Sequence, residues 1–151
     1  MRLVVLAILA GAVVAASPPA AAAATAVNGG GRATVDGVSA FSQFGFGVSV
    51  APDGSARGHF NCLMAGASEF PGFDLMAVRG RVTSAVINGS TATLEGAGMF
   101  QTGNQGKQAA TFRAVVTAGG PGAGTLQLTL LTPFVFVLPT ETVLNGTIRI
   151  G

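Results

Sequence analysis

The chain has 151 residues, a formal net charge of +2 and a single cysteine. When Arg2 of the N-terminal segment is set aside, seven basic residues face six acidic ones, and so weak a charge argues against nucleic acid or an anionic membrane as a partner. One cysteine cannot form a disulfide within the chain, so the stability of the fold must come from its core.

The N-terminus has the order of a secretory signal peptide. Met1 and Arg2 supply a positive end, the run LVVLAILAGAVVAA carries no charge, and small residues with two prolines follow. The triplet Ala24-Thr25-Ala26 predicts cleavage after Ala26, which leaves residues 27–151 as one secreted domain. A transmembrane anchor is the alternative, but Pro18-Pro19 interrupts the run before the roughly 20 apolar residues that a span needs. We therefore expect no membrane span in the mature chain.

Residues 27–151 alternate between apolar and polar side chains in short runs, separated by glycine, proline, asparagine and aspartate. This is the pattern of half-buried strands, and no segment shows the periodicity of a helix. Eight strands are predicted, at 30–36, 41–50, 56–65, 74–86, 90–101, 109–117, 124–131 and 143–150. Their regular spacing and short turns favour an all-β antiparallel fold, either a β-sandwich or a flattened β-barrel.

The segment VAPDGSA predicts a tight hairpin between the second and third strands. Pro52-Asp53-Gly54 suits a type I turn followed by a glycine in the left-handed conformation. This three-residue loop pairs Val50 with Ala56 and, counting back along both strands, Phe44 with Cys62. All the apolar side chains of the two strands then share one face, as the register of a half-buried hairpin requires.

The third strand holds the only histidine and the only cysteine, His59 and Cys62, three residues apart. Side chains alternate along a strand, so residues three apart point to opposite faces. We predict Cys62 in the core and His59 outside, which excludes a shared metal site or a nucleophile–base pair. No second histidine is present, so we expect neither a metal nor a cofactor. The alternative for Cys62 is an exposed thiol that forms an intermolecular disulfide.

The loop at 66–74 carries two carboxylates, Glu69 and Asp74. Paired carboxylates held at a fixed separation can hydrolyse glycosides. No histidine or tyrosine supports this pair, and the chain lacks the motifs G-x-S-x-G and H-E-x-x-H. A hydrolase is therefore the weaker alternative, and we expect a protein that is not an enzyme.

Asn88-Gly89 predicts the turn between the fourth and fifth strands, and the length of the loop decides which side chains face the core. A two-residue loop would put the apolar residues of the two strands on opposite faces, whereas the three-residue loop 87–89 puts them on one face. We therefore predict the three-residue loop, which places Gly80 opposite Gly96 on the inner face. A large side chain from the facing strands fills that spot, or it is a cavity for a small apolar ligand.

The sparse charges of the strands fall on the outward face. The predicted register sets Arg81 opposite Glu95 as a cross-strand charge pair. A cationic patch there would bind an anionic group such as a carboxylate or phosphate, or else would only keep the surface soluble. The candidate residues for surface binding are Arg57, His59, Arg79, Arg81 and Arg113.

The segment LTPFVFVLPTE, 131–141, places the five apolar residues 134–138 between Pro133 and Pro139. Prolines at both ends suit an edge strand or a loop, because proline cannot donate a hydrogen bond inside a sheet. The segment either folds over the open end of the fold and covers the core, or it is an exposed apolar contact for a partner or lipid.

Three stretches, GGGRATVDG…FGFGVSVAPDGSARGHFNC, VRGRVTSAVINGSTATLEGAG and VLNGTIRI, resemble small secreted all-β domains of bacteria, the post-COAP type in particular. The resemblance implies the same fold and brings no catalytic residues, because those domains have no established activity. We predict a secreted, non-catalytic extracellular or cell-envelope domain with a binding or structural role, whose partner is a protein or another envelope component. The alternatives are a carrier of a small apolar ligand in the β interior and a hydrolase that uses the 66–74 carboxylates.

Overall fold

The computed structural model describes residues 23–65, 75–103 and 105–151. No described residue lies in a helix, and all strand pairs are antiparallel. The predicted all-β antiparallel fold is confirmed, with one short strand, β8, that was not predicted. The strands are β1 (Thr25–Thr34), β2 (Ser42–Val50), β3 (Ser55–Ala65), β4 (Leu75–Asn88), β5 (Thr91–Thr102), β6 (Gln108–Thr117), β7 (Thr125–Thr132), β8 (Phe136–Val137) and β9 (Glu141–Ile150).

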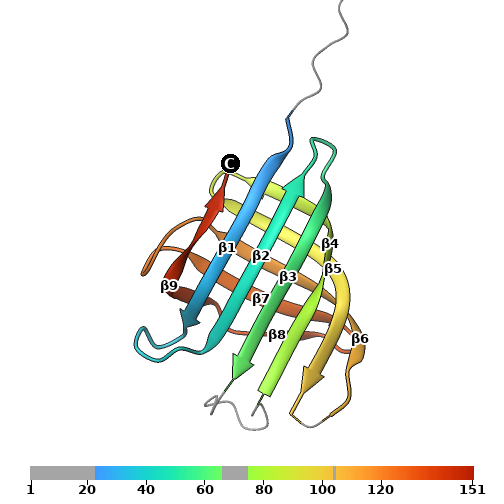
Figure 1. Ribbon diagram of the computed structural model, residues 1–151, viewed down its shortest axis with the longest axis vertical. Coiled ribbons are helices and arrows are strands. Elements are labelled where there is room, and N and C mark those ends of the chain that lie inside the picture. The colour runs from blue at the N-terminus through green and yellow to red at the C-terminus, as the bar shows by residue number, and fades with distance from the viewer. Residues whose placement is uncertain (1–22, 66–74, 104) are drawn as a thin grey trace, which may run out of the picture.

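The nine strands form one sheet that bends round into a ring. Their order is β6-β5-β4-β3-β2-β1-β9-β7-β8, and β6 also pairs with β7. Figure 1 shows β1 to β5 side by side in one layer, with β7 and β8 crossing behind them. Because side chains alternate along each strand, the ring sorts them into an inner set and an outer set.

A glycine-rich turn, 118–124, connects β6 to β7 and lies along one edge of β9. β7 itself pairs with only two residues of β9. Further along, Gly122 donates its N–H to the Val143 carbonyl at 2.9 Å. Gly119 and Ile148 exchange backbone hydrogen bonds of 2.9 and 3.0 Å. The turn therefore continues the pairing of β9 where β7 no longer reaches it.

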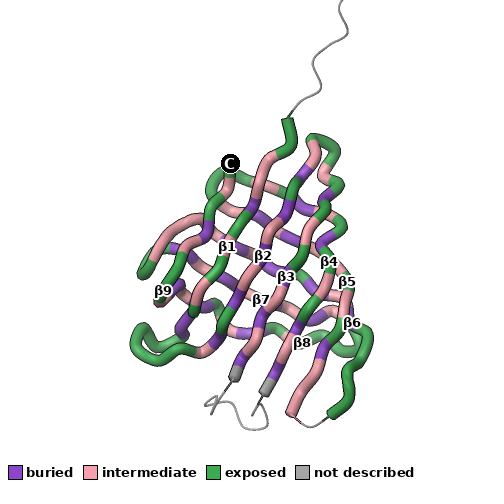
Figure 2. Tube along the Cα trace, viewed as in Figure 1, coloured by how far each residue is buried: buried purple, intermediate pink, exposed green. Residues whose placement is uncertain are grey.

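The hairpin between β2 and β3 has the predicted turn and register. Gly54 adopts a φ of 83°, as the left-handed position requires. Val50 pairs with Ala56, and Phe44 pairs with Cys62. Figure 2 shows the result as buried residues that alternate with more exposed ones along β2 and β3.

The predicted three-residue loop at 87–89 is wrong. Asn88 pairs with Thr91, which leaves the two-residue turn Gly89-Ser90. The pairing then shifts by one residue at Thr83, where β4 contains a bulge. The prediction used the longer loop to shift the pairing of the two strands, whereas in the structure the bulge makes that shift. Apolar residues on both sides of the bulge therefore still face the core.

Aromatic rings fill the inside of the ring of strands. The ring centroids of Phe60 and Phe112 lie 5.1 Å apart in a stacked arrangement. Gly80 pairs with Gly98, not with Gly96 as predicted. A Cβ on Gly80 would lie 2.7 Å from the Phe112 ring, and one on Gly96 would lie 2.9 Å from it. The Phe112 ring therefore fills the space over these inward-facing glycines. The structure supports the interpretation that a large side chain packs there, not that the space is a ligand cavity.

The apolar segment between the two prolines divides between core and surface. Leu138 is buried, and Phe136 packs partly against the core. Val135 and Val137 are exposed. Side chains alternate through β8, which pairs with β7, so part of the segment covers the core as the first alternative predicts. Contact of the exposed valines with a partner or lipid stays a prediction.

Candidate functional site

β3 and β4 bring four of the predicted candidate residues together on the outside of the ring. His59 pairs directly with Arg81, and Asn61 pairs with Arg79 in the next row. Arg57 lies earlier on β3 and faces outward as well. The side chains of all four candidates are exposed, so their predicted orientation is confirmed.

Cys62 points into the core, as predicted, and does not meet His59. Its relative exposure is 0%. Burial raises the pKa of the thiol, and the nearby Glu141 carboxylate raises it further. The thiol is therefore protonated, unreactive and closed to other molecules, which argues against the intermolecular disulfide.

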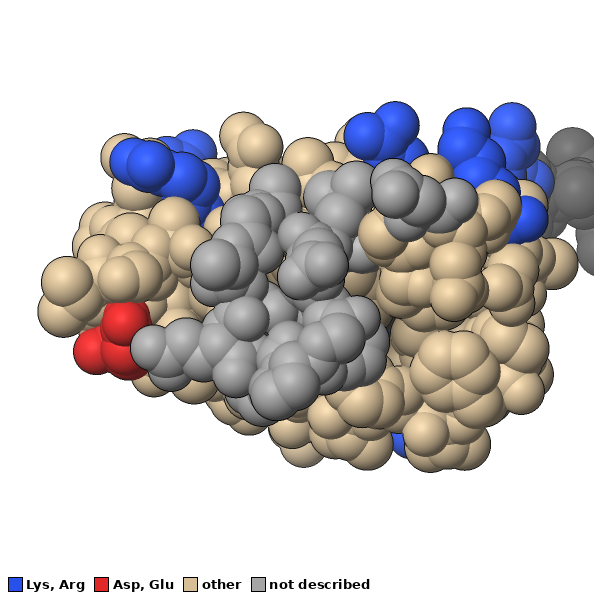
Figure 3. All heavy atoms as spheres, turned by 90° about the horizontal axis from the view of Figure 1, so that it is seen from below, with Lys and Arg blue, Asp and Glu red and all other residues tan. Residues whose placement is uncertain are grey.

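The outward surface continues from β3 across β2 and β1 to β9. Paired residues join Arg149, Asn28, Gly47 and His59 in a single row, and Arg32 lies further along β1. Figure 3, which looks at one end of the ring, shows blue lysine and arginine side chains gathered along the upper side of the molecule. We call this surface the cationic face and define it by the exposed residues Arg32, Arg57, His59, Arg79, Arg81 and Arg149.

Glycines keep the middle of the cationic face flat. Gly30 pairs with Gly45 between the two groups of cations, and Gly47 lies in the neighbouring row. A Cβ on Gly45 would meet no atom within 4 Å, so the space above it is open. The face therefore presents backbone in its centre and guanidinium groups on either side.

Within the described residues, the arginines of the cationic face have no carboxylate partner. Among the residues that the structure describes, only Arg113 forms an ion pair, with Glu95 at 2.7 Å. The predicted pair of Arg81 with Glu95 is wrong, because the bulge in β4 sets Arg81 opposite Ala97. Arg113 thus stands apart from the other candidates, since its charge is already compensated.

Two of the four described acids, Asp36 and Asp53, are held by their own turns. Asp36 Oδ1 accepts hydrogen bonds from the N–H groups of Val38 and Ser39, each at 2.8 Å, and these bonds lower its pKa to about 2. Asp53 accepts the N–H of Ser55 at 2.9 Å. The other two described acids are ion-paired or buried. A net charge of +2 therefore conceals a local excess of positive charge on one face.

One buried carboxyl group escaped the sequence analysis. Glu141 has a relative exposure of 0%, and its Oε2 accepts a hydrogen bond from Ser42 Oγ. Burial raises the pKa of Glu141 to about 7, although the Ser42 hydrogen bond acts in the opposite direction. Its position in β9 could have indicated that it is buried, because it lies two residues before the inward-facing Val143 and therefore on the same face of the strand. Ser42, Cys62 and Glu141 are all buried, so this cluster is closed to a substrate that approaches from the surface.

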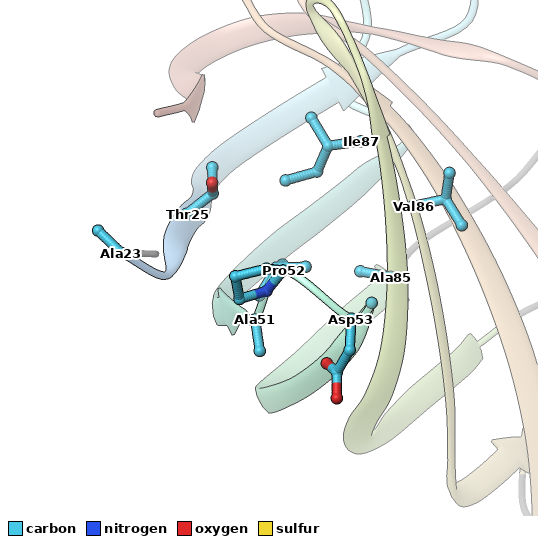
Figure 4. Close-up of a pocket in the computed structure, with 10 residues that line it drawn as sticks. Ala23, Thr25, Ala51, Pro52, Asp53, Ala85, Val86 and Ile87 are labelled. Carbon is cyan, nitrogen blue, oxygen red and sulfur yellow. The ribbon is translucent and has the colours of Figure 1, made fainter. Parts of the chain in front are cut away.

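A hollow of about 520 Å³ lies at the end of the ring where the described chain begins, as Figure 4 shows. Ala23 and Thr25 form part of its lining, together with the turn at 50–54 and residues 85–87. Cleavage after Ala26 would remove one wall, so this hollow is not a site of the predicted mature domain.

The described residues contain no group of three or more His, Cys, Asp or Glu side chains that could hold a metal ion. That part of the chain also contains no helix with the length and hydrophobicity of a membrane span. Glu69 and Asp74, the predicted hydrolase pair, lie outside the described residues. No protein-family model, curated protein or solved structure matches the chain.

Proposed function

We propose that residues 27–151 form a secreted, non-catalytic binding domain of the extracellular space or cell envelope. Its cationic face contacts an anionic polymer that carries phosphate or carboxylate groups. The observation that supports this function is the set of exposed arginines on one flat face, none with a carboxylate partner among the described residues.

The chemistry of the face suits such a partner. A guanidinium group offers planar, paired N–H donors that match phosphate and carboxylate oxygens. The glycines between Arg32 and Arg79 raise no walls, so an extended chain can lie across the strands. Cations on both sides of the glycine strip would then contact successive anionic groups of one polymer.

The other two functions have less support. A carrier needs space inside the ring, and the Phe112 ring occupies the glycine spot that would have supplied it. The hydrolase rests on Glu69 and Asp74, which are outside the described residues. The resemblance to post-COAP domains is compatible with the proposed function and stays a prediction.

The experiment compares two single substitutions that remove the same charge. Arg81→Gln removes an unpaired arginine of the cationic face, and Arg113→Gln removes the arginine paired with Glu95. Binding of the secreted protein to polyphosphate and to polyglutamate is measured by fluorescence anisotropy at fixed ionic strength. We expect Arg81→Gln to weaken binding roughly tenfold, since a charge-assisted contact is worth about 1.5 kcal/mol or more.

Arg113→Gln should leave the affinity for the polymer within about twofold of the unaltered protein, because Glu95 already compensates the charge of Arg113. Loss of this exposed ion pair should also change the stability of the fold little. Equal losses for both variants would mean that only net charge matters, and the proposed function would be wrong. The absence of binding to both polymers would also overturn it.

A further inference from the structure

A groove opens in the outer surface of β3, β4 and β5, at one border of the cationic face. Its volume is about 350 Å³, near the lower end of the range for small-molecule sites. The residues that line it include Leu63, Ala77, Arg79, Met99, Gln101 and Lys107.

The strand register explains why these side chains meet. Ala77 pairs with Leu63 on one side and with Gln101 on the other. Arg79 pairs with Met99 in the adjacent row. All five residues are at outward positions, so two neighbouring rows form the floor across three strands. Lys107 lies just before β6, the strand next to β5, and completes the lining.

The lining combines hydrocarbon with positive charge. Met99 is a large apolar side chain that is 42% exposed, and Leu63 and Ala77 continue the apolar floor. Arg79 and Lys107 form no ion pair with any described carboxylate. An occupant therefore gains from burying apolar surface at one end and from a negative charge at the other.

We propose that this groove binds an amphipathic anion, a single negatively charged head on a short aliphatic chain. The head contacts Arg79 and Lys107, and the chain lies on Leu63, Ala77 and Met99. This inference rests on the proposed function, because Arg79 belongs to the cationic face, and it adds a small-ligand site to that face. The volume suits a chain of about eight carbons more than a long lipid.

The direct test is an NMR titration of the ¹⁵N-labelled secreted protein with octanoate. We expect saturable binding with a Kd of about 1 mM or tighter, as for a good ligand of this size. The amides of Leu63, Ala77, Arg79, Met99 and Gln101 should shift most. Octyltrimethylammonium has the same chain with the opposite charge, and acetate has the same head without the chain. Each should bind at least about tenfold more weakly than octanoate.

Two substitutions locate the site. Met99→Gln makes the floor polar without changing the length of an exposed side chain, and Lys107→Gln removes one charge. Each should weaken octanoate binding by about threefold to tenfold. Equal binding of octanoate and octyltrimethylammonium, or shifts centred outside the groove, would overturn the inference.

A crossed comparison separates this inference from the proposed function. Arg149→Gln lies on the cationic face but outside the groove, so it should weaken polyphosphate binding and leave octanoate binding unchanged. Met99→Gln should weaken octanoate binding and leave polyphosphate binding unchanged. If octanoate does not bind while Arg149→Gln weakens polyphosphate binding, the groove inference fails alone. If octanoate binding responds to Met99→Gln while polyphosphate does not bind at all, only the polymer function fails.

Discussion

Ser42 donates a hydrogen bond to the carboxyl group of Glu141, and this bond joins the first residue of β2 to the first residue of β9, 99 positions later. The other carboxyl oxygen, Oε1, is buried without a hydrogen-bond partner. No ion pair compensates the group within the described residues. A charged carboxylate is costly in such surroundings, which is why the pKa of Glu141 is raised from 4.5 to about 7.

The raised pKa makes the free energy of unfolding depend on pH. Between pH 4.5 and about 7 the folded state holds the Glu141 proton while the unfolded state releases it. The contribution of this group is therefore complete below pH 4.5 and is lost as pH rises to about 7. At 1.4 kcal/mol per pH unit, the loss amounts to about 3 kcal/mol. Urea unfolding at pH 5 and at pH 8 measures it.

Glu141→Gln tests the cause, because glutamine is neutral and can still accept the Ser42 hydrogen bond. We expect this variant to lose the pH dependence and to exceed the stability of the unaltered protein at pH 8 by up to about 3 kcal/mol. Glu95→Gln is the control: its carboxylate is partly exposed, so it should change stability by about 1 kcal/mol or less. No gain at pH 8 for Glu141→Gln would show that the carboxyl group is solvated.

The packing of Phe112 over glycine predicts a sharp difference between two glycine-to-alanine substitutions. A Cβ on Gly96 would lie 2.9 Å from the Phe112 ring and would also meet the Arg81 carbonyl oxygen. We expect Gly96→Ala to lower the free energy of unfolding by about 1–3 kcal/mol. Gly45→Ala, with nothing within 4 Å of its Cβ, should lie within about 0.5 kcal/mol of the original protein. Similar losses in both variants would contradict the packing.

The buried thiol of Cys62 predicts slow chemical modification. In native buffer, Ellman's reagent should react with Cys62 many times more slowly than with the same protein in urea, because reaction requires opening of the core. The measurement is the absorbance of the released thiolate over time. If the native protein reacted as fast as the unfolded chain, the thiol would be accessible. An intermolecular disulfide through Cys62 would then again be a valid alternative.

The predicted signal peptide has a direct mass-spectrometric test. The intact mass of the protein released by cells should correspond to a chain that begins at Val27. β1 starts at Thr25, so a product that begins there would keep two further pairs with β2. An uncleaved product held in the membrane would contradict the interpretation of the N-terminus.

Features set by neighbouring residues could be predicted from the sequence. The turn at Pro52-Asp53-Gly54 determined its own geometry, and that geometry determined the pairing of β2 with β3. Alternation along β3 then separated His59 from Cys62 correctly. In each case the deciding interactions lie within one hairpin.

Features that depend on distant residues could not be predicted. In the hairpin of β4 and β5, the apolar faces align when the pairing shifts by one residue. A longer loop or a bulge at Thr83 produces that shift equally well, so the apolar pattern alone does not distinguish the two. The pairing of β1 with β9, which adds Arg149 to the row of His59, joins the two ends of the domain. The contact of Ser42 with Glu141 has the same long-range origin.

The glycine-rich turn at 118–124 has a consequence for self-association. A strand with free backbone N–H and C=O groups is a template to which another molecule can add a strand. Gly119 bonds both the N–H and the carbonyl of Ile148, and the turn bonds the carbonyl of Val143 through Gly122 and its N–H through Gly124. The strand β8, at the end of the sheet, is only two residues long. At these edges of the described chain, copies of the protein therefore find little free backbone on which to extend the sheet. If the cationic face binds a polymer as proposed, molecules held close together along that polymer would therefore not be joined by strand addition at these edges.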